Sequence, residues 1–186
     1  PEERAQVLAS YLSNDVWNVR PPIVLPSAPI HGPAPVDVSP FTTFELDVIL
    51  QKLKNGKSPG SDDTRVEYYK WSSPQHRELL LTLLNDCLMS CTTPLNWGES
   101  IVAMLPKPGQ MDPSLPSASR PICLTQSAYK IYASLLQVRL RHGLDDRLRP
   151  HQYGFRKCRS TSQPMHIQRR ILELFERQGE TLHVVF

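Results

Sequence analysis

The 186-residue sequence lacks the features that would place it in several common classes of protein. Its apolar runs are all far shorter than the roughly 20 residues that a membrane-spanning helix needs. No basic start followed by an apolar stretch indicates a secretory signal. The four cysteines are too few and too scattered for a disulfide framework, so an intracellular, reducing environment is expected, cytoplasmic or nuclear. A membrane span, a collagen, a coiled coil and a small disulfide scaffold are therefore excluded.

Residue patterns typical of common enzyme sites are also scarce. No glycine-rich phosphate loop of the Walker or dinucleotide type occurs. Cys87 and Cys91 are four residues apart, but no second pair follows to complete a zinc site, so packing in the core is favoured. Asp62 and Asp63 could hold a divalent cation, although aspartate after Pro-Gly-Ser is more typical of a hydrogen-bonded turn. No metal-binding residue is therefore assigned.

What the sequence does contain is an uneven distribution of charge. Residues 1–98 carry 8 Lys or Arg and 11 Asp or Glu, whereas residues 99–186 carry 13 and 7. Within 130–159 there are 8 basic residues and 2 acidic ones. This asymmetry indicates a polyanionic partner for the basic half, or alternatively a solvated, arginine-rich helix face.

Proline, capping and periodicity signals divide the chain into segments. Residues 1–17 are expected to form an amphipathic helix, and the proline-rich segment 18–40 an extended linker, because proline fixes φ and removes backbone donors. Order is expected to resume over 41–186, where Thr42 and Glu45 fit a helix capping box. The sequence predicts further elements in that region: helices over 42–53, 73–93, 127–141 and 162–177, an interruption at Gly143, strands at 101–105 and 120–124 that form an antiparallel hairpin, and the start of a strand at 181–186.

Two segments combine cations with stiff or aromatic neighbours. Lys107 and Arg120 are expected at the tip of the hairpin, where an ammonium and a planar guanidinium together suit a triphosphate. Alternatively, Lys107 and Arg120 are simply two exposed charges at the base of a loop, since the spacing alone does not distinguish the two interpretations. In the segment 152–161, three cations alternate with aromatic side chains, an arrangement suited to base stacking and phosphate contacts.

These segments occur in an order that resembles the N-terminal half of the reverse transcriptase domain of non-LTR (LINE-like) retrotransposons. The resemblance covers about 42–186. Asp63 stands where that family usually has glycine, which makes the local turn geometry uncertain. The segments that carry the resemblance are Lys57-Ser-Pro-Gly-x-Asp62, Trp97, Leu105-Pro-Lys-Pro-Gly109, Arg120-Pro-Ile-x-Leu124, Tyr129-Lys130-Ile131, Gln152-x-Gly-Phe-Arg156 and Arg159-Ser-Thr161.

The resemblance implies a fold and a set of site residues. The fold is α+β, a truncated right-hand polymerase with mostly helical fingers, a short antiparallel hairpin and the first palm strand. Lys107 and Arg120 would face the phosphates of the incoming deoxynucleoside triphosphate. The residues that would lie near the RNA template or the RNA/DNA hybrid are Lys57, Asp62, Gln152, Gly154, Phe155, Arg156 and Arg159.

The resemblance also implies catalytic groups that this sequence does not contain. Nucleotidyl transfer uses two metal ions held by carboxylates, and Mg²⁺ is expected for the full-length enzyme. In the family the paired aspartates follow Tyr/Phe-x, and that pattern does not occur in these 186 residues. The chain is therefore expected to be a polymerase fragment that binds no metal and is inactive alone. The alternative is a non-catalytic RNA-binding module derived from a fingers domain.

Overall fold

The computed structural model describes residues 2–17, 35–109 and 115–184, which form two compact units. Of the described residues, 2–17, 38–109 and 115–138 belong to the first unit, and 35–37 and 139–184 to the second. Most of the predicted linker, residues 18–34, lies outside the described residues. Within the region 41–186, the division between the units falls after Val138.

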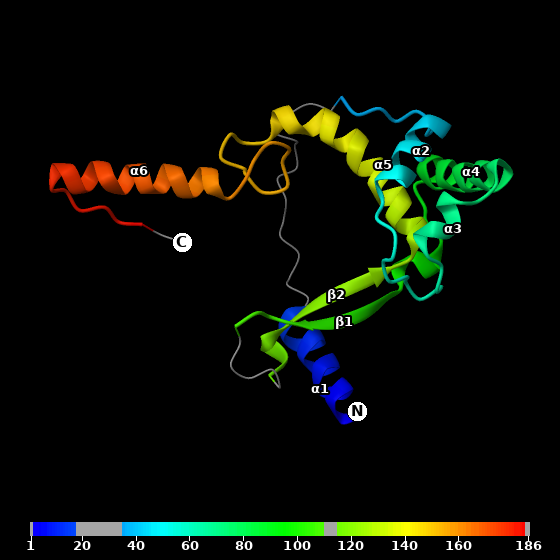
Figure 1. The fold of residues 1–186 in the computed structure, drawn as a ribbon, viewed down its shortest axis with the longest axis horizontal. Coiled ribbons are helices and arrows are strands. Elements are labelled where there is room, and N and C mark those ends of the chain that lie inside the picture. Colours follow the sequence, from blue (N-terminus) through cyan, green and yellow to red (C-terminus); the bar gives the residue numbers. More distant parts are fainter. Residues whose placement is uncertain (1, 18–34, 110–114, 185–186) are drawn as a thin grey trace. The chain divides into compact units, whose positions relative to one another are not determined.

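Figure 1 shows the helices of the first unit, two of which begin at capping signals in the sequence. Thr42 caps the second helix: its Oγ1 accepts from the Glu45 N–H at 3.2 Å, and a Glu45 carboxylate oxygen accepts from the Thr42 N–H at 2.8 Å. Ser73 caps the fourth helix, because its Oγ accepts from the His76 N–H at 3.3 Å, and it is followed by Pro74 in the first turn. The helices are α1 (Glu2–Tyr11), extended by a π-helical turn (Leu12–Val16), α2 (Thr43–Lys52), α3 (Val66–Lys70), α4 (Pro74–Ser90) and α5 (Ser127–Leu144).

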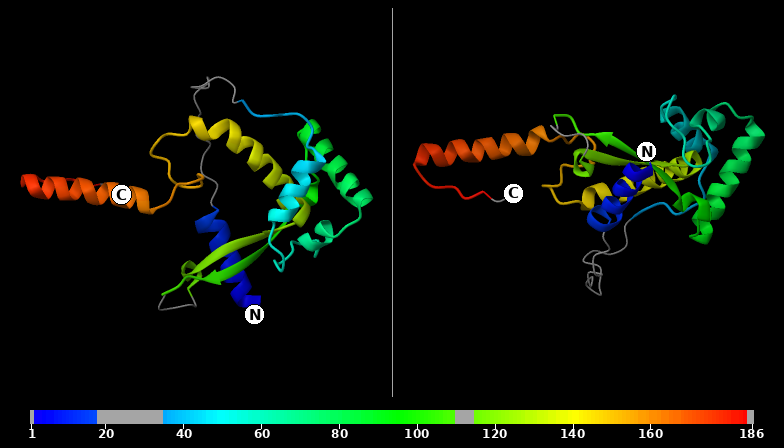
Figure 2. Two further views of the ribbon diagram at one scale, coloured as in Figure 1. Left: turned by 45° about the horizontal axis from the view of Figure 1, so that its top comes forward. Right: turned by 90° about the horizontal axis from the view of Figure 1, so that it is seen from below.

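The predicted antiparallel hairpin is confirmed. Strands β1 (Ser100–Pro106) and β2 (Ser119–Thr125) pair with Ala103 opposite Ile122. A 3₁₀ turn precedes β1 (Leu95–Gly98) and another precedes β2 (Pro116–Ala118). The two views of Figure 2 show this hairpin as a ribbon that leads into α5, the longest helix of the core.

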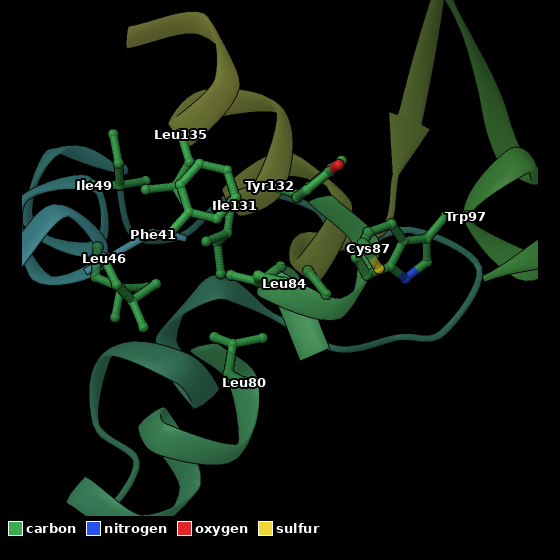
Figure 3. Packing of buried hydrophobic residues seen from close by; sticks show 12 residues of the cluster. Phe41, Leu46, Ile49, Leu80, Leu84, Cys87, Trp97, Ile131, Tyr132 and Leu135 are labelled. Atoms are coloured by element: carbon green, nitrogen blue, oxygen red, sulfur yellow. The ribbon is translucent and has the colours of Figure 1, made fainter. Parts of the chain in front are cut away.

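The core of the first unit lies between α2, α4 and α5 (Figure 3). Leu46, Leu84 and Ile131, one from each helix, are fully buried. Aromatic rings also pack in the core, where Phe41 and Tyr132 lie edge to face with their ring centroids 6.1 Å apart. Cys87 is buried among these side chains, as the core interpretation predicted, whereas Cys91 is exposed at the end of α4.

The second unit holds the end of α5, a 3₁₀ turn (Asp145–Arg147) and α6 (Ser162–Gln178). The predicted interruption at Gly143 is wrong, because α5 continues through it to Leu144. A Cβ at Gly143 would lie 2.6 Å from the Val36 side chain and 2.8 Å from the Pro35 carbonyl oxygen. Glycine therefore serves close packing here, and helix termination is not its role.

Two further observations concern the C-terminal region and membrane spans. Gly179 ends α6 in the left-handed conformation at φ 68°, as predicted. Residues 181–184 form no strand, and 185–186 lie outside the described residues. The predicted palm strand is thus absent from 181–184, which have no partner strand in the described ranges. No helix in those ranges has the length and apolar character needed to cross a bilayer.

Candidate functional site

The register of the hairpin determines how Lys107 and Arg120 are arranged. Arg120 pairs with Leu105, and the Lys107 N–H extends the ladder by donating to the Ala118 carbonyl oxygen at 2.8 Å. Residues opposite one another share a face, as do residues two apart on one strand. Lys107 and Arg120 therefore project from the same face as diagonal neighbours, about 7–8 Å apart at the backbone.

The two cations differ in their surroundings. The Arg120 side chain is exposed. The Lys107 ammonium donates to the Ser117 carbonyl oxygen at 2.8 Å, which holds it beside the turn that precedes β2. The hairpin tip thus presents an ammonium hydrogen-bonded to the chain and an exposed guanidinium.

The loop over residues 57–64, with Lys57 and Asp62, docks at the opposite end of β2. Gly60 is buried and packs directly against the backbone of Thr125 and Gln126. A Cβ at this position would lie 2.5 Å from the Gln126 backbone nitrogen. Ser127 Oγ donates to the Thr64 carbonyl oxygen at 2.7 Å. Arg120 and this docking point are separated by five residues of strand, or about 16 Å at roughly 3.3 Å per residue. The two predicted sites therefore do not merge.

The Asp62–Asp63 pair forms a turn. The Asp62 carboxylate accepts from the Thr64 N–H at 3.3 Å, and the Asp63 N–H donates to the Gly60 carbonyl oxygen at 3.2 Å. Asp63 adopts φ 51°, a left-handed conformation that glycine adopts without steric cost and that aspartate tolerates. The substitution for glycine noted in the sequence therefore leaves the turn intact.

The described residues do not fit the catalytic metal centre that a polymerase uses. No group of three or more His, Cys, Asp or Glu side chains in the described ranges could hold a metal ion. The Asp62 carboxylate is engaged in its turn. No catalytic step is therefore assigned to a metal held by these residues.

In the second unit, Arg156 is held by an extensive set of hydrogen bonds. Its Nε and Nη2 donate to the two carboxylate oxygens of Asp145 at 3.1 and 3.2 Å. Nη2 also donates to the Asp145 carbonyl oxygen at 2.9 Å, and Nη1 donates to the Arg149 carbonyl oxygen at 3.3 Å. Only 10% of the Arg156 side chain is exposed. The hydrogen bonds from Arg156 hold the pKa of the Asp145 carboxyl below its usual range.

The other predicted residues of the 152–161 segment surround this pair. The Gln152 amide donates to the Gly154 carbonyl oxygen at 3.2 Å. Phe155 is completely exposed, with φ at 61°. The Arg159 guanidinium lies 5.8 Å from the centroid of the Tyr153 ring, a cation–π arrangement. Of the five predicted residues in this segment, Gln152, Gly154, Phe155 and Arg159 are exposed, whereas the Arg156 side chain is directed inward to Asp145.

Sequence reasoning missed three residues that organise these sites. Asp145 was not identified as the partner of Arg156, and no local signal joins two residues eleven positions apart. Gln126 and Ser127 are buried polar residues at the β2–α5 junction, and the Gln126 amide donates to the Asn96 carbonyl oxygen at 2.9 Å. In the sequence, the only indication of this junction was that two polar residues, Gln126 and Ser127, lie between a predicted strand and a predicted helix.

Comparison with known proteins places the chain among transposon proteins, although no family profile matches it. It is 30% identical over 143 residues to "Probable RNA-directed DNA polymerase from transposon BS" of Drosophila melanogaster, covering 75% of this chain and 16% of the relative. The corresponding X-element protein of the same organism is 29% identical over 132 residues, covering 69% and 14%. "Transposon TX1 uncharacterized 149 kDa protein" of Xenopus laevis is 26% identical over 144 residues, covering 77% and 11%.

The chain thus spans at most about one sixth of the length of these relatives. The resemblance noted in the sequence is confirmed, since the relatives come from non-LTR retrotransposons. Over about three quarters of its length, this chain is homologous to the RNA-directed DNA polymerases of non-LTR retrotransposons.

Proposed function

We propose that this chain supplies template and incoming-nucleotide contacts of an RNA-directed DNA polymerase of a non-LTR retrotransposon. The proposal rests on the hairpin register and the Lys107–Ala118 backbone hydrogen bond, which together leave Lys107 and Arg120 on one face of a two-stranded ribbon. A triphosphate concentrates its charge over a short distance. A fixed ammonium beside a planar guanidinium provides both point-charge and forked hydrogen-bonding contacts to such a group.

The RNA template and the RNA/DNA hybrid are the proposed partners of the remaining site residues. Lys57 is exposed on the docked loop, and Arg159 is exposed in the second unit. Contacts of this kind are distributed over many phosphates, so each one contributes a small share of the affinity. Template binding is therefore expected to tolerate the loss of any single cation better than nucleotide binding does.

This difference provides the test. In a polymerase that contains these residues, Arg120→Ala should reduce kcat/KM for nucleotide by about ten- to hundredfold, from the loss of a charge-assisted contact of about 1.5–3 kcal/mol. The Kd for template should change little. Arg120→Lys should recover only part of the loss, because an ammonium cannot reproduce the planar fork. Lys52→Ala, an exposed cation at the end of α2, is the matched control.

Two outcomes would contradict the proposal in different ways. Intact nucleotide kinetics with weakened template binding would assign Arg120 to the template path. Unchanged kinetics and unchanged binding would make the two cations ordinary surface charges. In that second case, the persisting RNA binding would favour the alternative, an RNA-binding module without a role in nucleotide use.

A further inference from the structure

Arg156 lies in the segment that the proposed function assigns to the template, but its hydrogen bonds are directed inward. Its guanidinium makes the four hydrogen bonds described above, two of them to the Asp145 carboxylate, and is almost fully buried. A guanidinium has five N–H donors in a fixed plane. Four of these donors are thus used within the chain, so at most one Nη1–H of the 10%-exposed side chain is left for an RNA phosphate. The geometry therefore argues against a forked, two-donor phosphate contact by Arg156.

The residue that does project outward is Phe155. Its side chain is completely exposed, and its backbone is left-handed at φ 61°. Non-glycine residues adopt this conformation rarely, and they do so when the surrounding structure holds them there. Arg156, the next residue, supplies such a restraint through its ion pair with Asp145.

Cations flank the projecting ring. Lys157 and Arg159 are exposed on the same short loop, and Arg159 lies over the ring of Tyr153. One of the two acidic residues between 130 and 159 is Asp145, whose charge is compensated by Arg156. An exposed aromatic ring on the same loop as exposed cations fits a single-stranded nucleic acid, whose bases stack while its phosphates are neutralised. An apolar protein surface would not match this charge.

We propose that Phe155 stacks on an unpaired base of RNA, that Lys157 and Arg159 contact the adjacent phosphates, and that Arg156 is a positioning residue held by Asp145. This inference rests on the proposed function and deepens it, because it separates the residue that contacts RNA from the residue that orients it. The ion pair fixes the loop before RNA arrives, so less ordering is needed on binding.

The first experiment measures binding of a short oligouridylate to the full 186-residue chain between about 50 and 200 mM salt. Phe155→Leu keeps an apolar side chain but removes the aromatic face, so affinity should fall about ten- to hundredfold with an unchanged salt slope. Arg159→Gln should reduce the salt slope by about 0.7, the value for one phosphate contact on a single strand. Arg156→Gln should leave the salt slope unchanged.

The second experiment separates positioning from simple electrostatics. Asp145→Asn removes a negative charge, which by Coulomb's law alone should strengthen binding to a polyanion. If Asp145 holds the loop through Arg156, the same variant should instead bind RNA several-fold more weakly. Asp146→Asn, at the adjacent exposed acidic residue, is the matched control and should bind as tightly as the wild type or slightly more tightly. Thermal unfolding of both variants shows whether the chain remains folded.

The outcomes distinguish this inference from the proposed function. If the wild-type chain shows no salt-dependent binding of oligouridylate, the proposed template role fails, and this inference fails with it. If the wild type binds but Phe155→Leu matches it, stacking by Phe155 is refuted. If Arg156→Gln lowers the salt slope as Arg159→Gln does, or Asp145→Asn binds more tightly, the positioning role is refuted. The last two results leave the proposed function intact.

Discussion

Replacing Gly60 with alanine should undock the loop that carries Lys57 and Asp62. The φ angle of Gly60 lies outside the left-handed region, so its backbone would accept an L residue. The obstacle is contact, because a Cβ would lie 2.5 Å from the Gln126 nitrogen and 2.6 Å from the Thr125 carbonyl carbon. Both neighbours are backbone atoms at the junction of a strand and a helix, so neither can rotate away.

The size of the effect follows from these distances. Ordinary contact begins at 3.4 Å, so the loop must move by 0.9 Å (3.4 minus 2.5). A shift of that size is enough to break the weak hydrogen bond from the Gln126 amide to Ser61 Oγ, now 3.3 Å long. Overpacking of this kind typically costs about 1–3 kcal/mol. We expect Gly60→Ala to lower the free energy of unfolding by about 2 kcal/mol.

Urea denaturation measures this change from the shift in midpoint at constant slope. Gly98→Ala is the control, because a Cβ at Gly98 would meet no atom within 4 Å. If Gly60→Ala proves as stable as Gly98→Ala, the loop does not pack against the β2–α5 junction as described, and the reasoning is refuted.

Three further predictions concern the core, the ion pair and the chemistry. Leu84→Ala should lower the free energy of unfolding, measured in urea, by about 2–5 kcal/mol, because Leu84 is fully buried. The loss should be clearly larger than for Leu83→Ala, on the exposed side of α4. Equal losses would contradict the burial of Leu84 in the core. Because the pKa of Asp145 is lowered in the folded chain, its stabilising effect should be present above its unfolded value of about 3.9 and disappear as pH falls through the folded value. The stability difference between wild type and Asp145→Asn, measured from pH 7 downward, should therefore shrink towards zero in acid, and a constant difference would argue against the ion pair. Finally, primer extension on an RNA template with Mg²⁺ or Mn²⁺ should show no incorporation above background by the 186 residues alone, since they lack the paired-aspartate pattern; template-dependent incorporation would overturn that expectation.

Local signals in the sequence were sufficient for most elements. The capping box at Thr42, the proline after Ser73 and the left-handed glycine at 179 each act within a single turn of helix, so they could be read from a few neighbouring residues. The hairpin followed from two short apolar runs around a proline-rich loop. The short helix α3 carried no comparable signal, and the sequence did not predict it.

Tertiary structure decided the features that depend on distant partners. Gly143 suggested a break from sequence alone, but its lack of a side chain accommodates Pro35 and Val36, more than a hundred residues earlier. The side chains of Lys107 and Arg120 share a face only because of the strand register. Arg156 belonged to a cationic segment in the sequence, yet Asp145 turns it inward and leaves Phe155 exposed. Helix caps and turns depend on adjacent residues, whereas register, burial and ion pairing depend on which distant segments the folded chain brings together.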